Sequence, residues 1–355
     1  MGVTATMTRR EFTAAGLTTL AGFAHAVDDA PVGANMGLLL YSYGRRATAE
    51  KDKNFADPVR FIEFAKTRGA NAVQLPLGSR TEADAALIRK ASEKHGVHVE
   101  GIIAPPKDEK ADRDRFTNEL ATARNAGAGV VRVVMLGGRR YEVFEKPEEF
   151  AAFAKRAEET LRIAEPIAKS QKVVLAVENH KDFRTDEQVA LLKKFGSDWL
   201  GVCLDTGNNL ALLEDPLGAV ETLAPFARSV HLKDIGVEES SDGFRMAEVP
   251  LGQGCFDLKA MVAAVRKANP TARFLLEMIT RDPLLIPCLG EKYWATLGSV
   301  PGRDVARTLR LVRKHARKDA LPRITTLKPD EQLAAEDRHV RESFAYAAKE
   351  RLIPG

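Results

Sequence analysis

A regular alternation between short apolar runs and longer charged stretches constrains the fold of this chain more than any other feature, and it begins near residue 36. The apolar runs, rich in Val, Ile and Leu, are predicted strands: Met36–Tyr41, Asn71–Leu75, Val97–Ile103, Val130–Leu136, Val173–Glu178, Leu200–Leu204, Ser229–Lys233 and Arg273–Glu277. The stretches between them have helical period near 57–68, 81–95, 108–126, 147–169, 185–195, 216–226 and 256–268, with a last one near 302–317. Strands that alternate with helices indicate βαβ units, so we predict an α/β protein with a single closed (β/α)₈ TIM barrel.

The alternative for such an alternation is an open, doubly wound sheet. That fold usually carries a glycine-rich phosphate turn after its first strand, whereas this first strand runs into Tyr41-Ser42-Tyr43-Gly44-Arg45-Arg46. We therefore expect one barrel over residues 27–318 and a C-terminal helical extension over 319–355. The apolar residues of the extension, Leu333, Val340 and Phe344, have helical spacing, which favours packing on the barrel or on a partner over a membrane anchor.

The N-terminus, residues 1–26, has the order of an export signal. Arg9-Arg10 and Phe12 precede a short apolar stretch, Ala14–Phe23, and then the small-x-small sequence Ala24-His25-Ala26. The paired arginines resemble a twin-arginine signal, which predicts a periplasmic or otherwise exported protein without membrane insertion of the mature form. The alternative is an amphipathic N-terminal helix of a cytosolic protein.

Charge and cysteine content exclude several classes of protein. The 53 basic and 49 acidic residues leave a formal net charge of only +4, and part of that excess lies in the first ten residues, so we expect no nucleic-acid partner. The three cysteines, Cys203, Cys255 and Cys288, form neither a CxxC metal pattern nor a disulfide framework.

Four successive predicted strands, the fifth to the eighth, end with a side chain that can bind a metal. These side chains are Glu178, Asp205, His231 and Glu277. Active sites of (β/α)₈ barrels lie at the carboxyl ends of the strands, so the four should meet there. Three carboxylates beside one imidazole repel one another unless a cation lies among them. One such residue alone is more simply a cap or an ion-pair partner, but the set predicts a divalent metal with oxygen-rich ligands, Mn²⁺, Mg²⁺ or Co²⁺ rather than structural zinc.

Strand pleating and nearby basic residues add candidates for substrate binding. Residues two apart share a face of a strand, so His180 should point inward with Glu178, and Lys233 with His231. Both are candidates for substrate binding or proton transfer; the alternatives are a solvent-facing histidine and a lysine paired with a barrel carboxylate. Arg139-Arg140 after the fourth strand and Arg281 after the eighth could bind a carboxylate or hydroxyls, or lie on the surface as plain charges.

The strings VENH, CLDTGN, SVHLKD and LLEM, which contain the four candidate ligands, resemble the sugar phosphate isomerase/epimerase family with its xylose-isomerase-like barrel. The segment Val249-Pro250-Leu251-Gly252-Gln253-Gly254 also resembles the family's loop after the seventh strand, and the likeness runs from about Met36 to about Arg313. The resemblance implies one divalent metal ion, Mn²⁺ first, with Mg²⁺, Co²⁺ or Zn²⁺ as alternatives. It further implies a small carbohydrate substrate and an acid/base pair at Glu178 and Glu277. A homo-oligomer is compatible with it.

Two positions depart from the family's ketose 3-epimerases, which have His where this chain has Asn208 and Arg where it has Val237. Asn208 is therefore a further candidate for substrate binding. We expect a metal-dependent isomerase or epimerase that abstracts a proton next to a ketone of an unphosphorylated sugar. The alternatives are a lyase on the same barrel, by elimination from 3-keto glycosides or decarboxylation of 3-oxo sugar acids, and a non-enzymatic sugar-binding protein. A three-metal nuclease needs more histidines at the strand ends than His180 and His231.

Overall fold

The computed structural model of the protein describes residues 33–49, 55 and 57–354. The predicted export signal, residues 1–26, lies outside the described residues. Residues Pro31–Gly355 group into one compact unit. In the described part of the chain, no helix combines the length and the apolar character that crossing a membrane requires.

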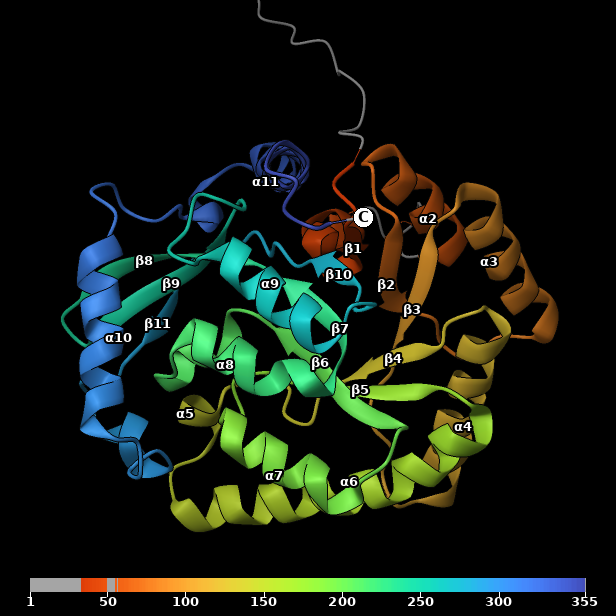
Figure 1. Cartoon of the computed structure of the whole chain (residues 1–355), viewed down its shortest axis with the longest axis horizontal. Coiled ribbons are helices and arrows are strands. Elements are labelled where there is room, and N and C mark those ends of the chain that lie inside the picture. Colours follow the sequence, from red (N-terminus) through yellow and green to blue (C-terminus); the bar gives the residue numbers. More distant parts are fainter. Residues whose placement is uncertain (1–32, 50–54, 56, 355) are drawn as a thin grey trace, which may run out of the picture. The chain divides into compact units, whose positions relative to one another are not determined.

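Eight parallel strands close into a barrel, in the order β1-β10-β7-β6-β5-β4-β3-β2 (Figure 1). The strands are β1 (Gly37–Leu39), β2 (Ala72–Pro76), β3 (His98–Ile102), β4 (Val130–Val133), β5 (Val174–Glu178), β6 (Leu200–Asp205), β7 (Ala227–Leu232) and β10 (Phe274–Leu276). Each lies within or overlaps one of the eight apolar runs, so the predicted TIM barrel is confirmed. The runs form strands because their β-branched residues pack both inside the barrel and under the helices.

The helices around the barrel also follow the predicted stretches. They are α2 (Pro58–Thr67), α3 (Glu82–His95), α4 (Lys110–Asn125), α6 (Pro147–Gln171), α7 (Thr185–Phe195), α8 (Pro216–Leu223) and α9 (Leu258–Ala268). Two short helices, α1 (Gly44–Ala49) and α5 (Arg140–Val143), were not predicted. Side-chain caps determine several of the starts. Asp57 and Asp215 each accept a hydrogen bond from a backbone N–H in the first turn, and each precedes a proline, which favours helix initiation.

A second, three-stranded sheet was not predicted from the sequence. It is formed by β8 (Asp234–Ser240), β9 (Gly243–Val249) and β11 (Leu284–Ile286), which are antiparallel in the order β11-β9-β8. Helix α10 (Gly302–His315) packs on this sheet and not on the barrel: Val312 lies in a core cluster with Ile235 and Phe244. The stretch predicted near 302–317 is thus a helix, but it does not cover the eighth barrel strand.

The C-terminal helix α11 (Pro329–Lys349) packs on the barrel instead. Its Val340 and Phe344 belong to the same hydrophobic core as the barrel strands, and both are fully buried. Figure 1 shows α11 above β1 and β10. After the helix, the chain returns to the first strand, where Asn35 Nδ2 donates to Ile353 O at 3.1 Å. The predicted extension therefore completes the core of the barrel.

Candidate metal centre

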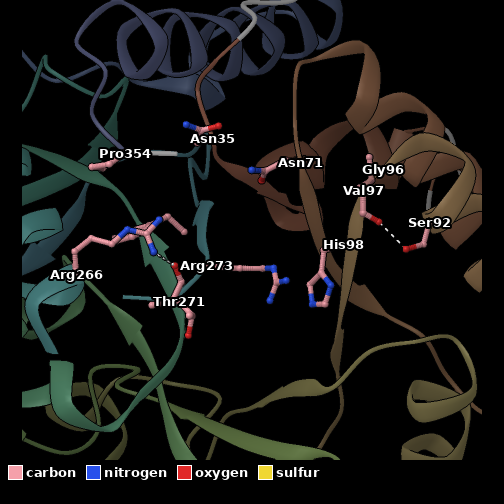
Figure 2. A pocket seen from close by; sticks show the side chains of 12 residues that line it. Asn35, Asn71, Ser92, Gly96, Val97, His98, Arg266, Thr271, Arg273 and Pro354 are labelled. Atoms are coloured by element: carbon pink, nitrogen blue, oxygen red, sulfur yellow. Dashed lines mark hydrogen bonds between the residues drawn. The ribbon is translucent and has the colours of Figure 1, made fainter. Parts of the chain in front are cut away.

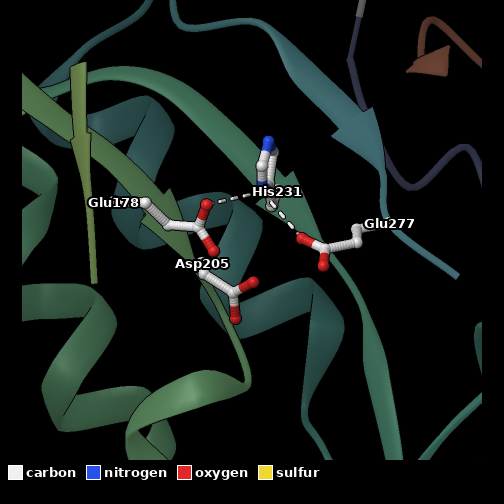
Figure 3. A group of neighbouring side chains, drawn as sticks. All are labelled: Glu178, Asp205, His231 and Glu277. Carbon is white, nitrogen blue, oxygen red and sulfur yellow. Dashed lines mark ion pairs between the residues drawn. The ribbon is translucent and has the colours of Figure 1, made fainter. Parts of the chain in front are cut away.

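The barrel brings the four candidate ligands together at the carboxyl ends of its strands. Glu178 ends β5, Asp205 ends β6, His231 lies near the end of β7, and Glu277 directly follows β10. Each offers one ligand atom, and these atoms all lie within 4.8 Å of one another (Figure 3). All four residues are buried. The arrangement can hold a single cation.

Crowded polar atoms in this cluster fit such a cation. Asp205 Oδ2, His231 Nδ1 and Glu277 Oε2 are buried and make no hydrogen bond within the described chain, although Lys233 Nζ lies 2.8 Å from Asp205 Oδ2. His231 Nδ1 lies 2.7 Å from Glu277 Oε2 and 3.9 Å from Glu178 Oε2, so this ring nitrogen and the carboxylate oxygens face one space. Buried polar atoms rarely lack a hydrogen bond. A divalent ion with one nitrogen and three carboxylate ligands would satisfy these atoms.

The other ring nitrogen of His231 is held by a hydrogen-bonded chain inside the barrel. His231 Nε2 lies 2.8 Å from Gln74 Oε1, and Gln74 Nε2 donates to Glu100 Oε2 at 3.0 Å. Ser229 Oγ also donates to Glu100 Oε2, at 2.6 Å. Because the carboxylate accepts from the amide nitrogen, the amide oxygen faces His231 and accepts from Nε2–H. Nε2 therefore carries a proton, and Nδ1 is the nitrogen that would bind a metal. Burial alone would lower the pKa of His231, but Cys203 and Glu277 raise it well above its usual value, so without an ion Nδ1 is protonated as well.

Two buried cations contact the ligands. Arg132, on β4, donates from Nε to Glu178 Oε2, and Lys233 Nζ lies 2.8 Å from Asp205 Oδ2 and 3.2 Å from Glu277 Oε1. Burial alone would raise the pKa of Glu178, but Arg132 and the nearby histidines lower it to about 2. Burial raises the pKa of Asp205 to about 6, although Lys233 opposes this. Glu178 is thus held as a carboxylate at neutral pH.

A further ring of polar residues surrounds this cluster. Asn208 Nδ2 donates to Glu178 Oε1 at 3.1 Å, and Asn208 Oδ1 accepts from Lys181 Nζ. Glu248, on β9, lies 3.6 Å from Lys233 Nζ and binds Arg281 through two hydrogen bonds, the shorter one 2.7 Å long. The unpredicted sheet therefore contributes a carboxylate to the site. The same contacts place Arg281 beside the cluster, joined to it through Glu248.

The remaining predicted site residues lie further out. His180 is half-buried, and its Nδ1 lies 3.0 Å from Leu136 O. Burial lowers its pKa, although Glu178 opposes this, so the ring is neutral at neutral pH. Arg139 pairs with Glu142 at the start of α5 and forms no hydrogen bond or ion pair with the four ligands in the described part of the chain. Its neighbour Arg140 is buried against Glu187 and Phe150.

A separate cavity of about 520 Å³ opens at the other end of the barrel (Figure 2). Asn71, His98 and Arg273, which line it, lie at the beginnings of β2, β3 and β10. In barrels of this kind the amino-terminal end serves stability, whereas the chemistry takes place at the carboxyl end. The metal cluster and not this cavity is therefore the candidate active site.

Comparison with known families agrees with this geometry. The family model described as the xylose isomerase-like TIM barrel matches residues 62–315. The chain belongs to this family. The match begins after β1 and includes the four residues of the buried carboxylate–histidine cluster.

Three similar proteins illustrate the family. A putative L-ribulose-5-phosphate 3-epimerase of Haemophilus influenzae is 32% identical over 255 residues, which cover 63% of this chain and 85% of the relative. A 3-oxo-isoapionate decarboxylase of Pectobacterium atrosepticum is 28% identical over 155 residues, 43% of this chain; the match spans about half of that relative, 53%. A xylose isomerase-like barrel protein of Mycobacterium smegmatis, crystallised in complex with magnesium, shares the fold with a TM-score of 0.51 and 14% identity, covering 79% of this chain and 97% of that one.

Proposed function

We propose that the protein is a metal-dependent enzyme that removes a proton from the carbon beside a ketone of an unphosphorylated sugar or sugar derivative. The observation that carries the proposal is the pair Glu178 and Glu277. They come from β5 and β10, which are not neighbours in the barrel, and Figure 3 shows their carboxylates pointing toward one another beside His231. A carboxylate on each side of a bound carbon can remove a proton from one face and return it to the other.

The chain supplies the groups that this chemistry needs. When bound, a divalent cation at the four ligands polarises the ketone and makes the adjacent C–H more acidic. Glu277 and Glu178 are both held as carboxylates, because Lys233 and His231 lower the pKa of Glu277 against the effect of burial, and Arg132 does so for Glu178. Lys233 stays charged, because Asp205, Glu277 and Glu248 raise its pKa although burial would lower it. Lys233 is therefore suited to holding carboxylates and substrate oxygens, and not to transferring a proton.

The second candidate is a lyase on the same barrel, which either forms the enediolate by loss of CO₂ from a 3-oxo sugar acid or expels a neighbouring group from the enediolate of a 3-keto glycoside. Val237, at the position where the resembling epimerases have an arginine, is fully buried in the core of the second sheet. Asn208, where they have a histidine, is engaged by Glu178 and Lys181. These differences favour a reaction other than simple epimerisation, and the decarboxylase among the relatives supports it. In a decarboxylation, the C–C bond breaks, its electron pair stays on the carbon beside the ketone, and a proton then replaces CO₂.

The test is incubation of the enzyme and Mn²⁺ with ketoses and 3-keto glycosides in deuterated water. We expect deuterium at the carbon beside the carbonyl, or release of a leaving group. Glu178→Gln and Glu277→Gln should each lower turnover by at least about 10²-fold, the scale of a lost acid/base group. Glu142→Gln, which alters a surface carboxylate paired with Arg139, is the control and should keep full activity. Turnover of a substrate without a carbonyl, with no deuterium incorporated, would show hydrolysis and contradict the proposal.

A further inference from the structure

The charged side chains around the candidate metal centre balance one another before any ion is counted. Its carboxylates are Glu178, Asp205, Glu277 and Glu248, and its cations are Arg132, Lys181, Lys233 and Arg281. Lys181 counts as mostly charged at neutral pH, since burial and its cationic neighbours lower its pKa only to about 8. With His231 neutral as a ligand, a divalent ion therefore leaves this buried site with an excess of two positive charges.

Two of these four cations are paired with carboxylates, and a third donates to an amide oxygen. Arg281 gives Nε and Nη2 to Glu248, and Lys233 Nζ lies between Asp205 and Glu277. Lys181 Nζ donates to Asn208. Lys181 also keeps charge for a ligand, but among these four cations only Arg132 has both terminal nitrogens without a hydrogen bond in the described part of the chain.

Arg132 has a pair of unused donors. Its Nε donates to Glu178, but its terminal nitrogens Nη1 and Nη2 make no hydrogen bond with the described residues. The side chain is only 8% exposed, and its guanidinium carbon lies 5.8 Å from the ring centre of Tyr41, which is 38% exposed. Two parallel N–H groups of a buried arginine match the two oxygens of a carboxylate.

We propose that the natural substrate is an anion, a sugar acid whose carboxylate is bound by the terminal nitrogens of Arg132 while its ketone lies at the candidate metal centre. This inference rests on the proposed function, and it names the class of sugar on which that chemistry acts. Because Arg132 binds Glu178 directly, a carboxylate on its terminal nitrogens lies close to the carbon that Glu178 serves. The anion also offsets the charge that the divalent ion brings into a buried site.

The test compares ligands of one carbon skeleton on the Mn²⁺-loaded protein by titration calorimetry: gluconate, glucitol and glucitol 6-phosphate. Gluconate should bind at least about tenfold more tightly than glucitol, the scale of one charge-assisted bidentate contact. Arg132→Met should remove this preference, and Arg132→Lys, which keeps the charge but not the fork, should keep part of it. Arg162→Met, an exposed arginine paired with Glu158 on α6, is the control and should bind gluconate as the wild type does.

Titration of Arg132→Met with Mn²⁺ alone shows whether Arg132 binds the substrate or has a purely structural role. Removing the positive charge beside Glu178 should leave Mn²⁺ affinity unchanged or raise it, whereas loss of a structural support would weaken the binding of both Mn²⁺ and gluconate. Equal binding of gluconate and glucitol by the wild type overturns the inference, even where neutral ketoses exchange deuterium and the proposed function stands. Tighter binding of glucitol 6-phosphate than of gluconate overturns the assignment to a carboxylate. If Arg132→Met does not fold, the wild-type comparison and Arg132→Lys decide the outcome.

Discussion

His231 can offer Nδ1 to a cation only while its other nitrogen keeps the proton, and Gln74 is the residue that ensures this. The orientation of the Gln74 amide is determined in turn by Glu100 and Ser229, both buried in the barrel interior. If the amide were reversed, its NH₂ group would face Nε2 and move the proton to Nδ1, where it would block the metal. The affinity of the centre thus depends on residues that never touch the ion.

We predict that Gln74→Leu lowers the affinity for Mn²⁺ by about 10- to 100-fold, the usual effect of losing the partner of a metal-bound histidine. Gln74→Glu, which keeps an acceptor oxygen, should lose much less. The control is Gln188→Leu, because Gln188 is an equally buried glutamine that donates to Val177 O on β5 but does not contact His231. Calorimetric titration measures the Mn²⁺ affinity of all three variants. An equal loss of affinity in Gln188→Leu would show that the effect of Gln74→Leu comes from altered packing.

The sequence pointed to the four ligands because each follows an apolar run at the end of a strand. It did not point to Gln74 or Arg132 as their partners. Gln74 and His231 are 157 positions apart in the sequence, and Arg132 and Glu178 are 46 apart. Such pairs come into contact only through the order of the strands in the closed barrel. Arg132 carried a signal nevertheless, as the one charged residue in the run Val130–Val134. A charge inside a buried strand calls for a partner in the barrel.

Among the elements, the loop from β5 to α7 depends on one buried carboxyl group. Asp182 Oδ1 accepts from the backbone N–H groups of His180, at 3.2 Å, and Phe183, at 2.8 Å, while Oδ2 has no hydrogen-bond partner in the described chain. Burial raises the pKa of Asp182 to about 7, although the backbone N–H groups oppose this. Between about pH 4 and pH 7 the unfolded chain has already lost this proton while the folded chain keeps it, so stability falls as the pH rises.

Asp182→Asn should remove that pH dependence. From about pH 5 to about pH 8, the wild type should lose about 2 kcal/mol of unfolding free energy more than the variant, which follows from the two pKa values. Urea unfolding at the two pH values measures the difference. Asp186→Asn, at an exposed aspartate in the first turn of α7, is the control and should follow the wild type. If the unfolding free energies of the wild type and of Asp182→Asn change in parallel with pH, Asp182 is not the source of the pH dependence.

The barrel elements could be predicted from the sequence because each strand–helix pair repeats one pattern of apolar spacing. The sheet β8-β9-β11 could not, because β8 and β9 contain charged residues, and β11 has only three residues and begins 35 positions after β9 ends. Because this sheet was not predicted, α10 was expected on the barrel. Its apolar face packs on the sheet instead.

At the scale of the whole molecule, the C-terminal helix closes the barrel core over its first strand. Besides the buried Val340 and Phe344, a polar contact ties the helix to the barrel: Tyr43 Oη donates to Asp337 Oδ1 at 2.9 Å, and Arg68 Nη2 lies 3.0 Å from the same oxygen. Helix α11 is therefore part of the folding unit, although it follows the last barrel strand by more than fifty residues.

We predict that Phe344→Ala lowers the free energy of unfolding by about 3–5 kcal/mol, the usual effect of emptying a buried aromatic position. Leu333→Ala, on the same helix but only half-buried, is the control and should cost no more than about 1 kcal/mol. Urea denaturation followed by circular dichroism measures both. Equally small losses of unfolding free energy in both variants would show that α11 is not part of the core.

The proposed location also concerns the whole chain. We predict that the precursor is cut near Ala26 and that replacing Arg9-Arg10 with Lys-Lys keeps the protein in the cytoplasm. Cell fractionation and N-terminal sequencing of the mature protein test this. An exported enzyme meets few sugar phosphates, which are largely cytoplasmic, so a protein that retains Met1 in the cytoplasm would remove the main support for an unphosphorylated substrate.

The pairing of each metal-binding carboxylate with a cation of the chain bears on whether the protein folds before or after it binds an ion. Lys233 holds Asp205 and Glu277, and Arg132 holds Glu178, so the barrel can close without an ion to hold its carboxylates together. We therefore expect an ion to enter a finished fold instead of nucleating it. Its identity should then depend on the supply of ions in the compartment where the protein works, since sites of this ligand type distinguish poorly between divalent metals.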